Sequence, residues 1–96
     1  MLLTVAGFRR TDRFDADVRK APPEIAKAAE AALEKLQENS RAGCLRMHPM
    51  QGLPKPMVFK LDVLANHSWQ ITFELHGDTV HLLRLATHKT IDRRPR

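Results

Sequence analysis

The sequence has a single cysteine, Cys44, so no disulfide can form within the chain. No spacing of cysteines and histidines typical of a zinc site is present. No apolar run approaches the length of a membrane-spanning helix, and the opening run MLLTVAGF is too short for a signal peptide before Arg9-Arg10. We therefore expect a cytoplasmic protein with no metal, no small-molecule cofactor and no membrane partner.

The chain is short, and its 96 residues show no internal repeat and no low-complexity tract. This length predicts one domain that covers residues 1–96. A domain of this size buries a modest core and leaves little room for a deep enclosed pocket. Any chemistry is therefore expected on an open face or in a groove.

Positive charge is concentrated in the second part of the chain, and the formal net charge is +5. Residues 1–40 hold seven Lys/Arg and seven Asp/Glu, whereas residues 41–96 hold nine Lys/Arg and four Asp/Glu. This asymmetry favours a protein that binds polyanions, although basic charge can also serve solubility alone. All five histidines lie in the basic part: His48, His67, His76, His81 and His88.

The first forty residues predict one strand and two helices. Residues 2–8 are short and apolar, which is typical of a strand. Phe14 and Val18 are four residues apart, which predicts a short helix over residues 12–20. Pro22-Pro23 ends this helix and starts the next, since proline is tolerated in the first helical turn. The second helix has one apolar stripe, formed by Ile25, Ala28, Ala29, Ala32, Leu33 and Leu36.

The period of the apolar residues changes to two after the second helix. Residues 45–48 predict a brief strand that Pro49 ends, and a turn is expected at His76-Gly77-Asp78. Residues 80–86 are almost continuously apolar, as in a central strand. Two further strands are predicted by alternation, the first from Phe59, Leu61 and Val63, the second from Trp69, Ile71, Phe73 and Leu75.

These elements predict an α+β fold with a short N-terminal strand, a helical hairpin and an antiparallel β-meander. The two helices are expected to pack on one face of the sheet. The other face is expected to be partly open and cationic. Four side chains are predicted on it: Lys60, Gln70, Thr72 and Arg84.

Three motifs give the chain a resemblance to a known family. They are His48-Pro49 followed by MQGLP, Trp69 at the start of a strand, and Thr87-His88 at the end of the last strand. With the two N-terminal helices and the closing LLRLATHKTID, the chain resembles the RelE/ParE toxin superfamily over nearly its whole length. Within it the sequence is most similar to the YafQ-type ribosome-dependent mRNA endonucleases, which implies a RelE-like microbial RNase fold.

The sequence departs from that branch at three positions. Ser68 stands where an aspartate usually precedes the tryptophan, and Leu64 stands where a histidine is expected. His67 is close to that position and is a candidate to replace the histidine. Asp92 stands where an aromatic residue often follows the final histidine by four positions.

The resemblance implies the toxin component of a bacterial type II toxin–antitoxin system that cleaves mRNA on the ribosome and inhibits translation. It also implies three partners: a cognate antitoxin, the ribosome and mRNA. Two alternatives stay open. One is a ParE-like inhibitor of DNA gyrase, which would not need the histidines. The other is a catalytically inactive basic module that binds antitoxin or RNA.

Cleavage by attack of the 2′-hydroxyl needs a base, an acid and cations near the phosphate, and no metal. Histidine can serve as base or acid near neutral pH. His88 is therefore the first catalytic candidate, followed by His48 and His67, although each also fits an ordinary loop or turn position. His76 and His81 are interpreted as structural.

The candidates for substrate binding are cationic, aromatic or amide side chains. Lys60 and Lys89 are phosphate contacts or solvated charges, and Arg84 needs a partner or a phosphate because it lies in an apolar strand. Trp69 either stacks on a base or packs in the core. Gln70 is assigned to the same face as Lys60.

Overall fold

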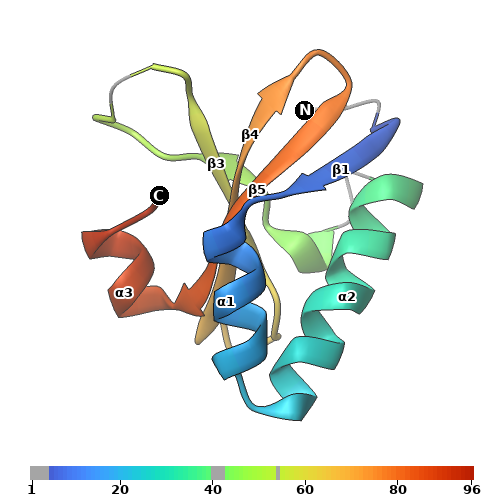
Figure 1. Ribbon diagram of the computed structural model, residues 1–96, viewed down its shortest axis with the longest axis vertical. Coiled ribbons are helices and arrows are strands. Elements are labelled where there is room, and N and C mark those ends of the chain that lie inside the picture. Colours follow the sequence, from blue (N-terminus) through green and yellow to red (C-terminus); the bar gives the residue numbers. More distant parts are fainter. Residues whose placement is uncertain (1–4, 40–42, 54) are drawn as a thin grey trace.

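The computed structural model describes residues 5–39, 43–53 and 55–96, and it contains one five-stranded sheet in the order β1-β5-β4-β3-β2 (Figure 1). Strand β1 runs parallel to β5, and every other pair is antiparallel. The predicted α+β class is confirmed. The elements are β1 (Gly7–Arg10), α1 (Asp12–Lys20), α2 (Pro23–Glu38), the 3-10 turn η1 (Gly43–Leu45), β2 (His48–Pro49), β3 (Val58–Asp62), β4 (Trp69–His76), β5 (Thr79–Thr87) and α3 (His88–Arg93).

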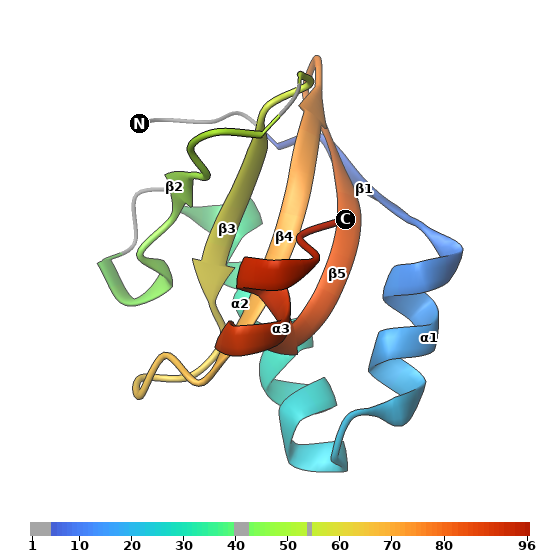
Figure 2. The same ribbon diagram turned by 90° about the vertical axis from the view of Figure 1, so that its left-hand side faces the viewer.

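Helices α1 and α2 cover one face of the sheet, as the sequence predicted (Figures 1 and 2). Apart from Ala28, which is partly buried, the apolar stripe of α2 is buried against the strands, and Phe14 of α1 is fully buried in the same core. Burial of apolar surface is the main favourable contribution to folding. The largest fully buried side chains of this core are Phe14, Phe73, Leu36, Leu61, Ile71, Leu82, Leu85 and Val80.

Helix α1 begins at a threonine that contacts both the helix and the sheet. Thr11 Oγ1 accepts a hydrogen bond from Phe14 N at 3.2 Å and donates one to Leu82 O at 2.8 Å. We expect Thr11→Ala to lower the free energy of unfolding by about 1–2 kcal/mol, because both the cap and the link to β5 are lost. Urea denaturation measures this change. Thr11→Ser keeps the hydroxyl and is the control, and equal stability of the alanine variant would contradict the capping role.

Two strands differ in position from the prediction. The first strand was predicted over residues 2–8, of which residues 2–4 lie outside the described part of the chain. The observed strand β1 continues to Arg10, because its residues pair with β5. The strand predicted over 45–48 is wrong, because Leu45 lies in the 3-10 turn. Pro49 does not end that strand but pairs with Phe59. Proline is tolerated there because β2 is an edge strand, where no ladder hydrogen bond is required of it.

The C-terminal helix α3 was not predicted, and it lies on the sheet face opposite α1 and α2 (Figures 1 and 2). Its Ile91 is fully buried. The residues after it continue across the sheet, where Thr72 Oγ1 donates to Pro95 O at 2.6 Å. The two predicted helices do pack on one face, but part of the face that was expected to be open is covered by α3 and the residues after it. A single apolar residue in HKTIDRR gives no helical period that sequence analysis can detect.

Candidate active site

A row of polar side chains crosses four strands on the face that α3 borders. The strand register places His48 opposite Lys60, Lys60 opposite Thr72, and Thr72 opposite Arg84. Residues directly opposite each other on neighbouring strands project to the same face of a sheet. The structure thus brings two predicted site residues, His48 and Lys60, side by side at the β2 edge.

His88 is the first residue of α3, immediately after the capping residue Thr87. Its main-chain N donates to Ser68 O at 3.0 Å, which ties α3 to the turn before β4. Its Nε2 lies 3.1 Å from Asp92 Oδ2, and Asp92 Oδ1 lies 3.6 Å from Lys60 Nζ. Asp92 therefore links two predicted site residues. In the sequence, Asp92 was noted only as a departure from the residue that the family usually has there. Residues four apart in a helix face each other, so a prediction of α3 would have indicated the contact between Asp92 and His88.

His67 lies in the turn between β3 and β4 and contacts a buried carboxylate. Its Nδ1 is 2.6 Å from Asp62 Oδ2, and the Asp62 side chain is only 3% exposed. Gln70 Nε2 donates to Asp62 Oδ1 at 3.0 Å, and Arg46 Nε is 3.6 Å from Oδ2. Asp62 was missed by sequence analysis, because alternation alone placed it as an ordinary polar residue of a strand.

A cavity of about 560 Å³ lies between the β3–β4 turn and the start of α3. It brings together three of the predicted site residues, His67, His88 and Lys89. His48 does not line it; this exposed ring lies with Nδ1 2.6 Å from Arg46 O. The cavity is lined by Asn66, His67, Ser68, Thr87, His88 and Lys89.

The other predicted substrate-binding residues lie away from this cavity. Trp69 is partly buried and packs against the core on the α1 and α2 side. Arg84 is buried, with Nε 2.8 Å from Asp17 Oδ2 and Nη1 donating to Arg94 O at 3.1 Å. Gln70 is buried against Asp62. Contacts of these three residues with RNA stay predictions.

The two histidines interpreted as structural lie at the opposite end of the sheet strands from the cavity. His76 and His81 stack with ring centroids 3.8 Å apart. Partial burial, followed by the positive charges of His76 and Arg9, lowers the pKa of His81 below its ordinary value of 6.5. Burial raises the pKa of Glu74, but hydrogen bonds from His76 and Arg96 outweigh it, so this pKa lies below its ordinary value.

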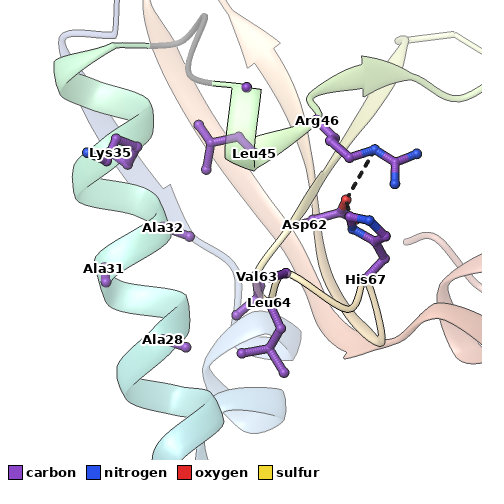
Figure 3. A pocket seen from close by; sticks show the side chains of 12 residues that line it. Ala28, Ala31, Ala32, Lys35, Leu45, Arg46, Asp62, Val63, Leu64 and His67 are labelled. Carbon is purple, nitrogen blue, oxygen red and sulfur yellow. Dashed lines mark ion pairs between the residues drawn. The ribbon is translucent and has the colours of Figure 1, made fainter.

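An apolar groove of about 420 Å³ lies on the other side of His67, between α2, η1 and residues 63–65 (Figure 3). Lys35 and Arg46 supply positive charge beside it. Among the described residues, no group of three or more His, Cys, Asp or Glu side chains is placed to hold a metal ion, and no helix could span a membrane. The apolar side chains that line it are Ala28, Ala31, Ala32, Leu45, Val63, Leu64 and Ala65.

No protein-family model and no curated protein matches the sequence. Solved structures do match. The E. coli DinJ–YafQ toxin–antitoxin complex contains a chain that matches with a TM-score of 0.70 at 18% identity, over 88% of this chain and 93% of that one. The Methanococcus jannaschii RelB–RelE complex matches with a TM-score of 0.68 at 20% identity, over 90% and 96%. YoeB from Staphylococcus aureus matches with a TM-score of 0.61 at 10% identity, over 90% and 97%.

Identities this low establish a shared architecture rather than a shared activity. The agreement covers most of both chains in each comparison. The predicted resemblance is therefore confirmed at the level of the fold. The chain has the RelE/YafQ-like toxin fold.

Proposed function

We propose that this protein is the toxin component of a bacterial type II toxin–antitoxin system and that it cleaves mRNA on the ribosome. The observation that supports this proposal is that His67, His88 and Lys89 line one cavity. A fold shared with YafQ and RelE supplies the context. Two imidazoles and an ammonium group around one open cavity are the groups that metal-free RNA cleavage needs.

The reaction is an attack of the ribose 2′-oxygen on the adjacent phosphorus. The 2′-O–H bond breaks as a base takes the proton, the new O–P bond closes a cyclic phosphate, and the P–O5′ bond breaks. An acid protonates the leaving 5′-oxygen, so the proton count balances. His67 and His88 supply one base and one acid, and Lys89 stabilises the charge on the phosphorane. Lys60, which Asp92 links to His88, is a second candidate for this stabilisation. His48, beside Lys60, is a further candidate to contact the phosphate.

Lys89 offers a test of the electrostatic contribution, because it is exposed and lines the cavity. We expect Lys89→Ala to weaken ribosome binding and to reduce the slope of log K against log salt by about one. Lys27→Ala removes an equally exposed lysine from the solvent side of α2 and should leave the slope unchanged. Filter binding of ribosomes over a salt series measures both, and equal losses for the two variants would refute the assignment of this face.

An antitoxin is the proposed protein partner, and the apolar groove beside α2 is its proposed docking site. The groove has an apolar floor of alanine, leucine and valine side chains, with Lys35 and Arg46 next to it (Figure 3). This surface fits an amphipathic segment that carries acidic residues along its edge. Because His67 lines both the groove and the cavity, an antitoxin seated there would lie next to the proposed catalytic groups.

The deciding experiment is induced expression in bacteria, with protein synthesis and transcript 5′ ends followed together. We expect synthesis to stop and new 5′ ends to appear within translated messages. Arrest with intact transcripts and trapped gyrase–DNA complexes would support a ParE-like activity in place of this proposal. Continued growth would favour a catalytically inactive binding module.

A further inference from the structure

We propose that Asp62 is a positioning residue, and that it and His67 form a buried carboxylate–imidazole pair that orients His67 as the general base. This inference rests on the proposed function for its catalytic part. The pairing itself is a property of the molecule that can be measured whether or not the protein cleaves RNA. Asp62 was not among the residues that the sequence indicated.

The contact between the two side chains determines which ring nitrogen carries the proton. His67 Nδ1 and Asp62 Oδ2 are 2.6 Å apart. Both atoms are fully buried, and neither forms a hydrogen bond of regular geometry within the described residues, so the 2.6 Å contact is the close polar contact they share. Two bare acceptors at this distance would repel each other, so we infer that Nδ1 carries a proton next to the carboxylate. In the neutral ring, Nε2 is then left with a free lone pair.

The surroundings of Asp62 hold its carboxylate in place. Gln70, itself 3% exposed, donates from Nε2 to Oδ1 at 3.0 Å. Arg46 Nε lies 3.6 Å from Oδ2 and adds a positive charge (Figure 3). A carboxylate in such a buried position is costly unless charges and hydrogen bonds compensate it. An apolar residue at this strand end would avoid that cost, so we infer a role for this carboxylate beyond packing.

The two residues whose side chains contact Asp62 Oδ2 both have an uncommon backbone conformation. His67 has φ 62° and Arg46 has φ 45°, the left-handed region that non-glycine residues seldom occupy. The turn is held by Val63 N donating to Trp69 O at 3.0 Å and by Ser68 Oγ donating to Asn66 Oδ1 at 2.7 Å. Such strain gathers at functional sites when the surrounding structure enforces it. Here it directs two side chains at one carboxylate.

The contact of Nδ1 with Asp62 leaves Nε2, the other nitrogen of the His67 ring, for the substrate. The side chain is 43% exposed although Nδ1 is buried, and it lines the same cavity as His88 and Lys89. His67 Nε2 therefore takes the 2′-hydroxyl proton, and His88 gives a proton to the leaving 5′-oxygen. The charged and titratable groups around His67 are Asp62 and Arg46 at the buried carboxylate, Lys35 in the neighbouring groove, and His88 and Lys89 in the lining of the cavity.

The test compares Asp62→Asn with Asp92→Asn, two changes that each remove one carboxylate next to one histidine. Nitrogen-15 NMR of the histidine rings is recorded first, with His67→Gln to assign the signals. We expect a downfield proton on His67 Nδ1 in the wild type and in Asp92→Asn, and its loss in Asp62→Asn. Thermal unfolding establishes that each variant is folded. Asp62→Leu, an apolar residue of similar size, is a second variant should the asparagine be unstable.

Cleavage of ribosome-bound message is then measured on the same proteins. We expect Asp62→Asn to lower kcat by about ten- to a thousandfold with KM little changed, because the base is misoriented rather than removed. An Nδ1 signal that is absent from the wild type, or that persists in Asp62→Asn, overturns the pair. A lost signal with wild-type kcat overturns the positioning role. A wild type that never cuts RNA refutes the proposed function, and the NMR result still decides the pair.

Discussion

His88→Ala is expected to slow cleavage of ribosome-bound message by about two to four decades, the usual loss when a group that transfers a proton is removed. His88 lines the cavity with His67, and its side chain is about half exposed. The hydrogen bond that ties this residue to Ser68 comes from the main chain and survives the substitution. The fold should therefore persist, since loss of an exposed side chain has a small effect on stability.

Two further variants separate proton transfer from structure. His88→Gln keeps hydrogen-bonding capacity but cannot titrate, so it should be as slow as the alanine variant. His81→Ala changes a histidine at the other end of β5, stacked on His76, and should leave the cleavage rate of the folded protein unchanged. Toxicity, cleavage and thermal midpoint are measured together. A folded His88→Ala protein that cuts at the wild-type rate would remove His88 from the mechanism.

Asp17→Ala is expected to produce the largest loss of stability, about 3 kcal/mol, or roughly 10–20 °C in Tm. Asp17 Oδ2 accepts from Arg84 Nε at 2.8 Å and from Leu85 N at 3.0 Å. The pairing of β1 with β5 ends at Leu82, and beyond that point Asp17 accepts the hydrogen bond of a β5 main-chain N–H, that of Leu85. Its removal leaves a buried guanidinium without its carboxylate and a strand N–H without an acceptor. Thermal and urea denaturation measure the effect.

Asp15→Ala is the matched control in the same helix. Asp15 forms a short ion pair with Arg10 at 2.7 Å, but both side chains are more than a third exposed. Water screens such a pair, so its loss should change the free energy of unfolding by less than about 1 kcal/mol. Similar losses for Asp15→Ala and Asp17→Ala would show that burial of the Arg84 pair does not contribute to stability.

The elements that sequence analysis predicted correctly are those with a repeating apolar pattern. The stripe from Ile25 to Leu36 predicted α2, and alternation predicted β3 and β4 close to their observed bounds. Such patterns are visible because burial acts on one face of each element. The errors lie where pairing decides the structure: Pro49 belongs to β2 only because Phe59 lies beside it.

The roles of the proposed site residues stay predictions, and the structure shows only where these residues lie. His67, His88 and Lys89 line one cavity, and the strand register places His48 opposite Lys60. The two carboxylates that contact these groups, Asp62 and Asp92, were not recognised as site residues. An acidic residue in a strand or tail looks the same in a sequence whether it faces water or a histidine ring.

The sequence by itself determined the α+β class, the helical pair, the meander and the basic character of the second part of the chain. These follow from the periodicity of apolar residues and from charge, which are local properties of the chain. Only the tertiary structure decided that α3 covers the second sheet face, that Arg84 is held by Asp17, and that Asp62 lies behind His67. These contacts join residues through strand register and turn geometry, and the energy of a buried polar group depends on neighbours that the local sequence does not specify.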